Sequence, residues 1–284
     1  MTPPTQTLQS ILDDVKSLEP LPQVAMRVMT LSSKVDLVPR ELVEVIETDA
    51  GLTAKVLKLC NSAYYGFRRE IASLPEAGNL LGCSTLVNLV VTSCTALYFR
   101  NYGGQSADAA RRQWQRSIST AISASLLAEA QGHVDRNRCY TVGLLENVGQ
   151  LVMERFLPDL RQELEATLAS GATRLEAEHA VLGIHHGEIG AQLAERWDFP
   201  DVLVEAIRHH HQPSGARLDP ALVGLAHLAE MAAQRHEQAE GRAPEAYEFC
   251  ESALAQSSLS RERFEELEPR LAAEIRRAEA LIDL

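Results

Sequence analysis

Apolar residues recur along the chain with the three- and four-residue spacing that places side chains on one face of an α-helix. The alternation typical of β-strands is scarce by comparison. Two of the helical stretches are formed by Leu52, Val56, Leu59 and Cys60, and by Ile118, Ala121, Ile122, Ser125 and Leu126. The pattern therefore predicts an all-α protein.

Prolines divide this helical pattern into segments of ordinary length. The residue before a proline is disfavoured in the α region, so each such pair marks an expected helix boundary. The pairs are Leu21-Pro22, Val38-Pro39, Leu74-Pro75, Leu157-Pro158, Phe199-Pro200, Gln212-Pro213 and Glu268-Pro269.

One polar, glycine-containing stretch, residues 101–106, separates two long helical regions. We place a boundary there, which gives an N-terminal helical lobe at residues 1–103 and a second helical lobe with C-terminal helices at residues 104–284. A chain of 284 residues is long enough to bury a substantial core in one large domain or in two packed lobes.

Charge and targeting signals narrow the possible partners. The chain carries 27 basic and 39 acidic residues, a formal charge of −12, and its basic residues are not segregated. A nucleic-acid backbone would be repelled, so no nucleic-acid partner is expected. The first ten residues have neither a basic start nor an apolar segment, so no signal sequence is expected, and no stretch approaches the roughly 20 apolar residues of a membrane span. We expect a cytoplasmic protein without a membrane partner.

The cysteines do not suggest chemistry. There are five of them, an odd number, and neither a C-x-x-C pair nor zinc-finger spacing is present. Buried, reduced thiols are the expected state.

Several separated motifs occur in the first lobe. A Leu21-Pro22 opening is followed by the acidic stretch from Ile46 to Asp49, by Leu52-Thr53, by a predicted helix end at Asn61-Ser62-Ala63 and by a Leu81-Gly82 turn. Together they resemble the HDOD family, the HD-related output domain, and the resemblance extends from about residue 14 to about residue 215. It implies an HD-like multi-helix bundle with an N-terminal helical lobe.

Some of these residues also have a purely structural explanation. Asp49 can cap a helix that starts near Gly51, and Asn61 and Ser62 can satisfy backbone groups where that helix ends. Ala50 departs from the family pattern, which usually has proline after the aspartate, and this leaves the helix start less sharply defined.

HDOD domains resemble the HD-domain phosphohydrolases, in which an early histidine, a His-Asp pair and a late aspartate hold metal. The resemblance places these positions at Arg116, at Glu146-Asn147 and at His227 of this sequence. Guanidinium is a poor metal ligand, and a neutral amide replaces a carboxylate. We therefore expect no bound metal, no cofactor and no catalytic residues.

Histidines nevertheless remain in this region. The resemblance places His186 and the His210-His211 pair at recurrent positions of the fold, and the apolar face of the helix that starts near Pro200 continues at that pair. Three interpretations stay open: hydrogen-bonded core histidines, a residual metal site using His186 and His210 with Glu146 or His227, and ligand binding without metal.

Glu146 lies on an otherwise apolar helix face, where an unpaired carboxylate would be costly. We hypothesise that Arg116 or a histidine pairs with it, so that an internal ion pair stands where the ancestral protein held metal. The alternative is that Glu146 marks an exposed helix edge.

These residues form one predicted pocket at the former active site: Arg116, Glu146, Asn147, His186, His210, His211 and His227. The resemblance implies a non-catalytic bacterial signal-transduction domain, such as a response-regulator output in a two-component system. Its expected partners are signalling proteins: a sensor, a receiver or a diguanylate-signalling protein. The alternatives are a metal-dependent phosphohydrolase of a nucleotide or cyclic dinucleotide, and a nucleotide-sensing domain without turnover.

Overall fold

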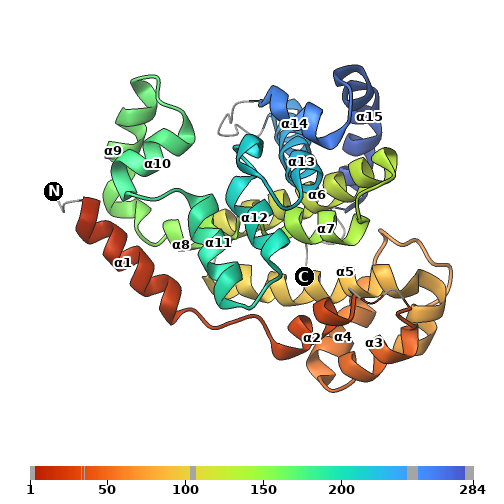
Figure 1. The fold of residues 1–284 in the computed structure, drawn as a ribbon. Coiled ribbons are helices and arrows are strands. Elements are labelled where there is room, and N and C mark those ends of the chain that lie inside the picture. The colour runs from red at the N-terminus through yellow and green to blue at the C-terminus, as the bar shows by residue number, and fades with distance from the viewer. Residues whose placement is uncertain (1–3, 33, 35, 103–106, 242–248, 279–284) are drawn as a thin grey trace.

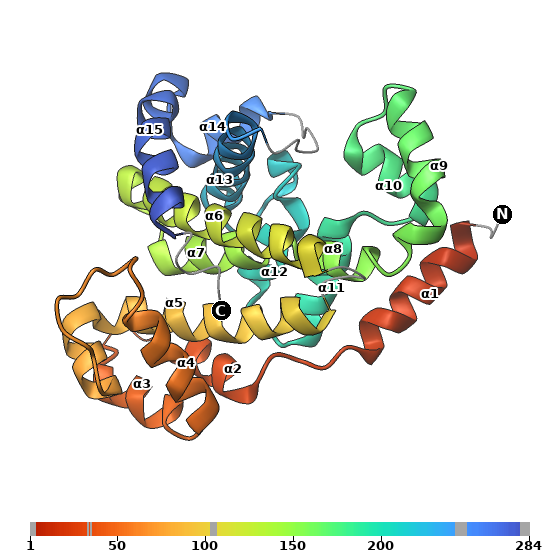
Figure 2. The same cartoon turned by 180° about the vertical axis from the view of Figure 1, so that it is seen from behind.

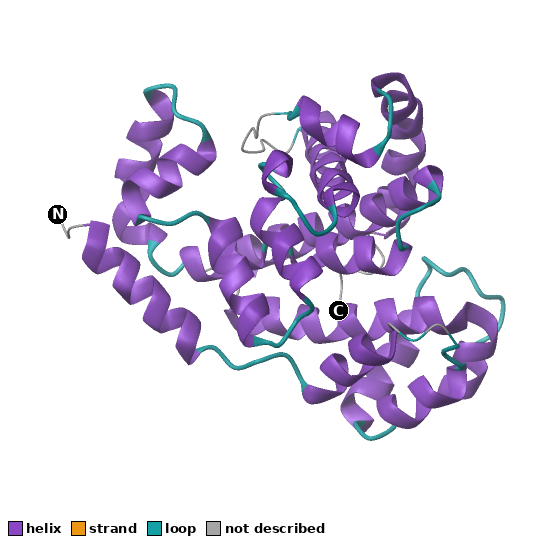
Figure 3. Cartoon of the chain, viewed as in Figure 1, coloured by secondary structure: helices purple, strands orange, loops and turns teal. Residues whose placement is uncertain are grey.

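Helices form every regular element that the computed structural model describes, which covers residues 4–32, 34, 36–102, 107–241 and 249–278 (Figures 1 and 3). This confirms the predicted all-α class. The predicted lobe boundary at 103/104 lies outside the described residues. The helices are α1 (Pro4–Ser17), α2 (Gln23–Ser32), α3 (Pro39–Ile46), α4 (Ala50–Cys60), α5 (Leu74–Tyr102), α6 (Ala107–Gln131), α7 (Arg136–Leu145), α8 (Val148–Met153), α9 (Leu157–Ala169), α10 (Arg174–Leu182), α11 (His186–Arg196), α12 (Asp201–His209), the 3₁₀ helix η1 (Pro213–Gly215), α13 (Pro220–Ala239), α14 (Glu251–Ser257) and α15 (Arg261–Ala278).

The long helix α5 connects the N-terminal helices with the rest of the molecule. It packs against α2, α3 and α4 on one side and against α6 and α7 on the other (Figures 1 and 2). Gly82 interrupts it with a φ of 80°, a left-handed conformation that glycine adopts readily. The turn predicted at Leu81-Gly82 is therefore a bend within this helix.

By length and composition, α5 contains one segment, Leu74–Arg100, that could cross a membrane, with a mean hydropathy of 1.7. The expectation that no stretch is long and apolar enough for a membrane span is wrong for this segment. Small polar residues interrupt the segment, but they lower its mean hydropathy only a little. Half of the segment is buried inside the protein. We describe it as a core helix of the bundle, because α2, α3, α4 and α7 pack on it.

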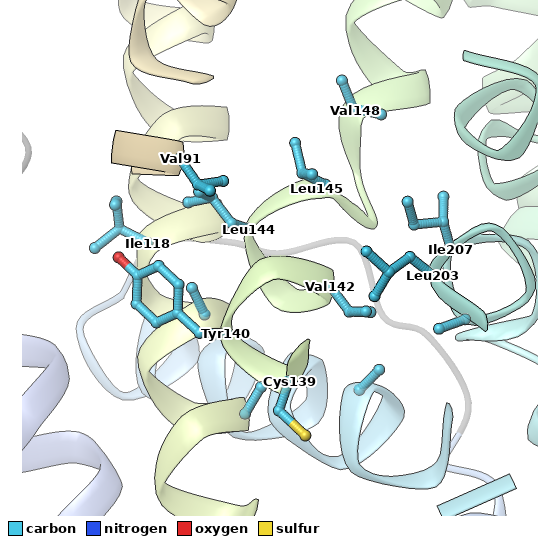
Figure 4. Packing of buried hydrophobic residues seen from close by; sticks show 14 of the residues in the cluster. Val91, Ile118, Cys139, Tyr140, Val142, Leu144, Leu145, Val148, Leu203 and Ile207 are labelled. Carbon is cyan, nitrogen blue, oxygen red and sulfur yellow. The ribbon is translucent and has the colours of Figure 1, made fainter. Parts of the chain in front are cut away.

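The helix α7 lies at the centre of the second half of the structure. Its residues from Cys139 to Leu145 are all buried, since the helix packs along α6 and also contacts α5, α12 and α13. Figure 4 shows Val142 facing Leu203 and Ile207 of α12, while Leu144 points toward Val91 of α5. This packing fixes the end of α7, where Glu146 and Asn147 follow.

The first helix, α1, lies apart from α2–α4 and packs against α8, α10 and α11 (Figure 1). Arg196 of α11 donates a hydrogen bond to the carbonyl oxygen of Val15 at 3.0 Å. Arg155, after α8, forms an ion pair with Asp14 at 2.6 Å. The N-terminal segment thus braces the part of the molecule that carries His186.

Candidate functional site

The first turn of α11 positions His186. Its N-cap is His185, whose Nδ1 accepts a hydrogen bond from the backbone N–H of Glu188 at 3.3 Å, while the Glu188 carboxylate accepts the N–H of His185 at 3.1 Å. This reciprocal capping box satisfies two free donors of the helix start. Burial lowers the pKa of His185 to about 4, which keeps the ring neutral so that Nδ1 can accept.

A buried carboxylate holds the His186 ring in place. Glu178 of α10 accepts hydrogen bonds from Nδ1 of His186 at 2.8 Å and from the backbone N–H of His186 at 3.0 Å. Arg174 binds the other oxygen of Glu178 at 2.6 Å. Burial raises the pKa of Glu178, but His186 and Arg174 outweigh it and lower this pKa to about 2. The Nε2 atom of His186 is thereby directed away from Glu178, toward α12.

Two further histidines follow the end of α12. His210 donates from Nδ1 to the carbonyl oxygen of Ile207 at 2.7 Å, and its Nε2, although buried, has no hydrogen-bond partner among the described residues. His211 lies with Nε2 only 2.7 Å from Nε2 of His186. The ligand atoms of these three histidines all fall within 4.8 Å of one another.

The helix α13 adds a carboxylate to this group. Glu230 is fully buried, with one oxygen 3.3 Å from Nδ1 of His211 and 4.0 Å from Nε2 of His210. Its other oxygen lies 3.4 Å from the amide nitrogen of Asn147, whose carbonyl oxygen accepts a hydrogen bond from Gln150 at 3.0 Å. We call His186, His210, His211 and Glu230 the histidine cluster.

Burial controls the protonation of the cluster. It lowers the pKa of His210 and of His211 well below their ordinary value, and neighbouring histidines lower both further. Burial also raises the pKa of Glu230 to about 7, although His186, Arg116 and the Asn147 amide act in the opposite direction. Neutral His210 and His211 rings keep a lone pair available for an electron-pair acceptor.

Glu146 is buried, as the apolar helix face indicated, but its predicted ion pair is wrong. Its exposure is 0%, and neither carboxylate oxygen has a hydrogen-bond partner among the described residues. Burial raises its pKa well above the ordinary value, and the charge of Glu230 adds to this effect. The side chains that could have paired with it lie against other carboxylates: Arg116 binds Glu237, and His211 lies beside Glu230.

Arg116 stands at the edge of the site. Its Nη2 lies 2.9 Å from Oε2 of Glu237 on α13, and both side chains are largely buried. Glu237 lies two helical turns beyond Glu230 on α13. The ion pair between Arg116 and Glu237 therefore links α6 to α13. The charge of Arg116 still reaches Glu230, whose pKa it lowers.

His227 does not take the role of a late metal ligand. Its Nδ1 donates to the carbonyl oxygen of His210 at 2.8 Å, and its Nε2 accepts the backbone N–H of Cys250 at 3.0 Å. Both ring nitrogens are therefore occupied by backbone groups. One helical turn later, Glu230 provides the side chain that reaches the other histidines.

The structure thus brings five of the seven predicted residues to one buried place: Glu146, Asn147, His186, His210 and His211. It adds Glu178, Glu230 and Glu237, which the sequence analysis missed. Glu230 had a usable signal, because it is a lone carboxylate within the apolar stretch from Leu225 to Ala233. Glu178 and Glu237 lie among other charged residues and had no comparable signal.

The sequence matches the HDOD domain family over residues 18–213. The chain belongs to the HDOD domain family. A protein of Treponema pallidum (strain Nichols), described as uncharacterized, is 29% identical over 213 residues, which are 74% of this chain but 40% of that protein. This chain therefore spans less than half the length of that relative.

Solved structures share the fold along nearly the whole chain. An HDOD domain protein of unknown function from Geobacter sulfurreducens has a TM-score of 0.77 at 22% identity, covering 97% of both chains. A candidate signal transduction protein from Marinobacter aquaeolei VT8 has a TM-score of 0.76 at 24% identity, covering 99% of this chain and 66% of the other. A candidate phosphohydrolase from Shewanella amazonensis SB2B has a TM-score of 0.72 at 24% identity, covering 95% and 97%. At these identities the likeness concerns the fold alone.

Proposed function

We propose that this HDOD chain is a non-catalytic signal-transduction domain that acts by binding other signalling proteins in the cytoplasm. A sensor, a receiver or a diguanylate-signalling protein is the kind of partner we expect. Membership of a signalling-related family supports the regulatory role. This chain matches only 40% of the Treponema relative. That share is consistent with a module that works together with other domains.

The enclosure of the site carries the non-catalytic part of the proposal. Glu146, His186, His210 and Glu230 have an exposure of 0%. A phosphohydrolase must let a charged phosphoester reach its metal and its attacking water. Here the polar groups face one another inside the bundle, and the early ligand position holds Arg116 tied to Glu237.

The nucleotide-sensing alternative has weaker support. A phosphate would need donors that are open to solvent and not already engaged. The Arg116 guanidinium is bound by Glu237, and the His186 ring is held by Glu178 and His211. Binding a nucleotide there would break these contacts within a closed interior.

A hydrolysis assay tests the first part of the proposal. The purified chain is incubated with bis(p-nitrophenyl) phosphate and with a cyclic dinucleotide, in the presence of Mn²⁺, Fe²⁺ or Zn²⁺, beside an active HD-type phosphohydrolase. We expect product formation no faster than in metal-containing buffer. Metal-stimulated turnover that disappears in His210→Gln would contradict the proposal.

Partner capture tests the second part. The chain is cross-linked in the cells that express it, purified under denaturing conditions and analysed by mass spectrometry. We expect one signalling protein cross-linked at a defined surface, and we expect that an exposed charge reversal at this surface abolishes the cross-link. Recovery of the chain without any reproducible cross-linked partner would refute a scaffold role.

A further inference from the structure

The ring nitrogens of the histidine cluster are oriented as in metal-binding histidines. A ligating histidine donates its other N–H to a carboxylate or a backbone carbonyl, which fixes the ring and directs the lone pair at the metal. His186 does this with Glu178, and His210 does it with the carbonyl oxygen of Ile207. In both rings the Nε2 atom is the one directed into the cluster.

The two Nε2 atoms of His186 and His211 are close enough to need a hydrogen or a cation between them. Their Nε2 atoms are 2.7 Å apart. His186 commits Nδ1–H to Glu178, which is itself held by Arg174, and Nδ1 of His211 lies beside the Glu230 carboxylate. With both hydrogens on Nδ1, two lone pairs would face each other. Either a hydrogen on one of the two Nε2 atoms, which the neutral Nε2–H tautomer of His211 supplies, or a cation must therefore lie between them.

The third histidine favours a cation over a proton. The Nε2 atom of His210 is buried without a hydrogen-bond partner among the described residues. A single proton shared by His186 and His211 leaves this atom unsatisfied, which carries a desolvation cost. A divalent ion would bind the His210 lone pair, which a proton shared by the other two rings does not do.

We propose that the Nε2 atoms of His186, His210 and His211 form a mononuclear site for a divalent transition metal, with zinc as the ion that three imidazole ligands suit best. The Glu230 carboxylate lies 3.3 Å from Nδ1 of His211 and holds that ring as Glu178 holds His186. Two nitrogens around a tetrahedral zinc lie roughly 3.4 Å apart, so the His186 and His211 rings need to separate only slightly.

The proposed site leaves the proposed non-catalytic function in place. Three histidines leave one position of a tetrahedral shell to water, but His186 and His210 have an exposure of 0%, so a phosphoester substrate does not reach that position. The ion would join the start of α11 to the end of α12, and Glu230 would connect this pair to α13. The ion would stabilise the buried histidine cluster, which lies where a hydrolase of this fold would carry out its reaction.

A second group of possible ligands lies at the surface next to this site, and its geometry does not suit a metal. It consists of His179, His185 and Glu188. Because Nδ1 of His185 accepts the backbone N–H of Glu188, the hydrogen of the neutral ring is on Nε2, which faces the Glu188 carboxylate. Ligation through Nε2 would break the cap of α11. This surface group therefore provides a matched control.

The test measures metal content and coordination, so it does not depend on activity. The purified full chain is stripped with a chelator, loaded with Zn²⁺ or Co²⁺, and analysed by elemental analysis. We expect about one ion per chain, a loss of at least tenfold in zinc affinity in His210→Gln and in His211→Gln, and no change in His179→Gln. X-ray absorption of the zinc-loaded wild-type chain should show three imidazole ligands, a result that needs no variant to fold.

Several outcomes would overturn the assignment. Failure of the wild-type chain to take up zinc or cobalt at micromolar concentration would show that a proton holds the His186–His211 pair. Zinc that is lost in His179→Gln but kept in His210→Gln would place the metal at the surface group. Zinc bound as proposed together with turnover would support the site and refute the non-catalytic function.

Discussion

A single carboxylate, Glu205 of α12, fixes the chain that leads into α13. One of its oxygens accepts the backbone N–H of Arg217 at 2.8 Å, and the other accepts those of Leu218 at 2.8 Å and Asp219 at 3.2 Å. Partial burial raises the pKa of Glu205, but the three backbone hydrogen bonds outweigh it and lower this pKa below the ordinary value.

The lowered pKa of Glu205 predicts a pH-dependent contribution to stability. A carboxyl group with a lowered folded-state pKa stabilises the protein above its unfolded-state pKa and loses this contribution as the pH falls through the folded-state pKa. We expect Glu205→Gln to reduce the free energy of unfolding by about 1 kcal/mol at pH 7, after allowance for solvent screening. The difference from wild type should shrink below about pH 4, near the ordinary carboxyl pKa.

Urea denaturation of both proteins between pH 3 and pH 8 measures this effect. The exposed Glu165 of α9 provides the control, and Glu165→Gln should unfold like the wild type at every pH. A difference for Glu205→Gln that is constant over the whole range would show that the contribution comes from packing and not from charge.

At the residue scale, the sequence predicted which side chains are buried better than it predicted their ion-pair partners. The apolar spacing around Glu146 correctly indicated an inward side chain, and the end of α12 correctly indicated inward histidines at His210 and His211. The pairing of a given cation with a given carboxylate depends on how one helix is rotated against another. The local spacing of residues does not contain this information. For this reason the expected pairing of Glu146 with Arg116 or a histidine is wrong, and Arg116 binds Glu237.

At the scale of elements, proline and capping residues set most boundaries. Pro39 and Pro158 stand in the first turn of α3 and α9, where the missing N–H costs nothing. Asp49 caps α4 through the N–H of Leu52 at 2.9 Å, which confirms its predicted role. Asn61 likewise binds the carbonyl oxygen of Leu57 at the end of that helix.

Other local predictions failed because tertiary contacts overrode them. Pro269 lies inside α15 and does not divide it, since Leu267 and Leu271 on either side pack into the core. The hydroxyl of Ser62 has no hydrogen-bond partner among the described residues, although it was expected to help end α4. In both cases the packed environment determines the outcome, and a short sequence window does not contain that information.

The close approach of α8 to α11 depends on Gly149. A Cβ atom at this position would lie 2.0 Å from the carbonyl oxygen of His186 and 2.7 Å from the backbone nitrogen of Gly190. These are backbone atoms of α11, which cannot rotate away as a side chain can. We expect Gly149→Ala to lower the free energy of unfolding by roughly 3 kcal/mol and to displace His186.

Thermal and urea unfolding compare Gly149→Ala with Gly51→Ala in α4. At Gly51 an added Cβ meets only the side-chain oxygen of Asp49, at 3.3 Å. Alanine also favours a helix by up to about 1 kcal/mol over glycine, so Gly51→Ala should be close to neutral. Equal stability of the two variants would mean that α8 and α11 do not approach each other as described.

At the scale of the whole molecule, the fold extends beyond the family match. The match ends at residue 213, yet α13 packs along α6 and α7, and α15 covers both α6 and α13. The helix α13 also supplies Glu230 to the histidine cluster. Periodicity predicted the all-α class and the family resemblance implied a helix bundle, but the order of packing depends on contacts between helices far apart in the chain.

If the C-terminal helices belong to the same cooperative unit as the rest of the bundle, a core substitution in α15 should also destabilise α6 and α13. Phe264 has an exposure of 0%, and the Arg235 guanidinium of α13 lies 5.5 Å from its ring. We expect Phe264→Ala to reduce the free energy of unfolding by about 3–5 kcal/mol with one cooperative transition. The exposed Arg276 of the same helix provides the control, and Arg276→Ala should leave the transition almost unchanged.

Hydrogen exchange of Phe264→Ala should show lower protection in α6, α13 and α15 together, because these helices share one core. Faster exchange confined to α15 would instead make the C-terminal helix an independent addition to the bundle.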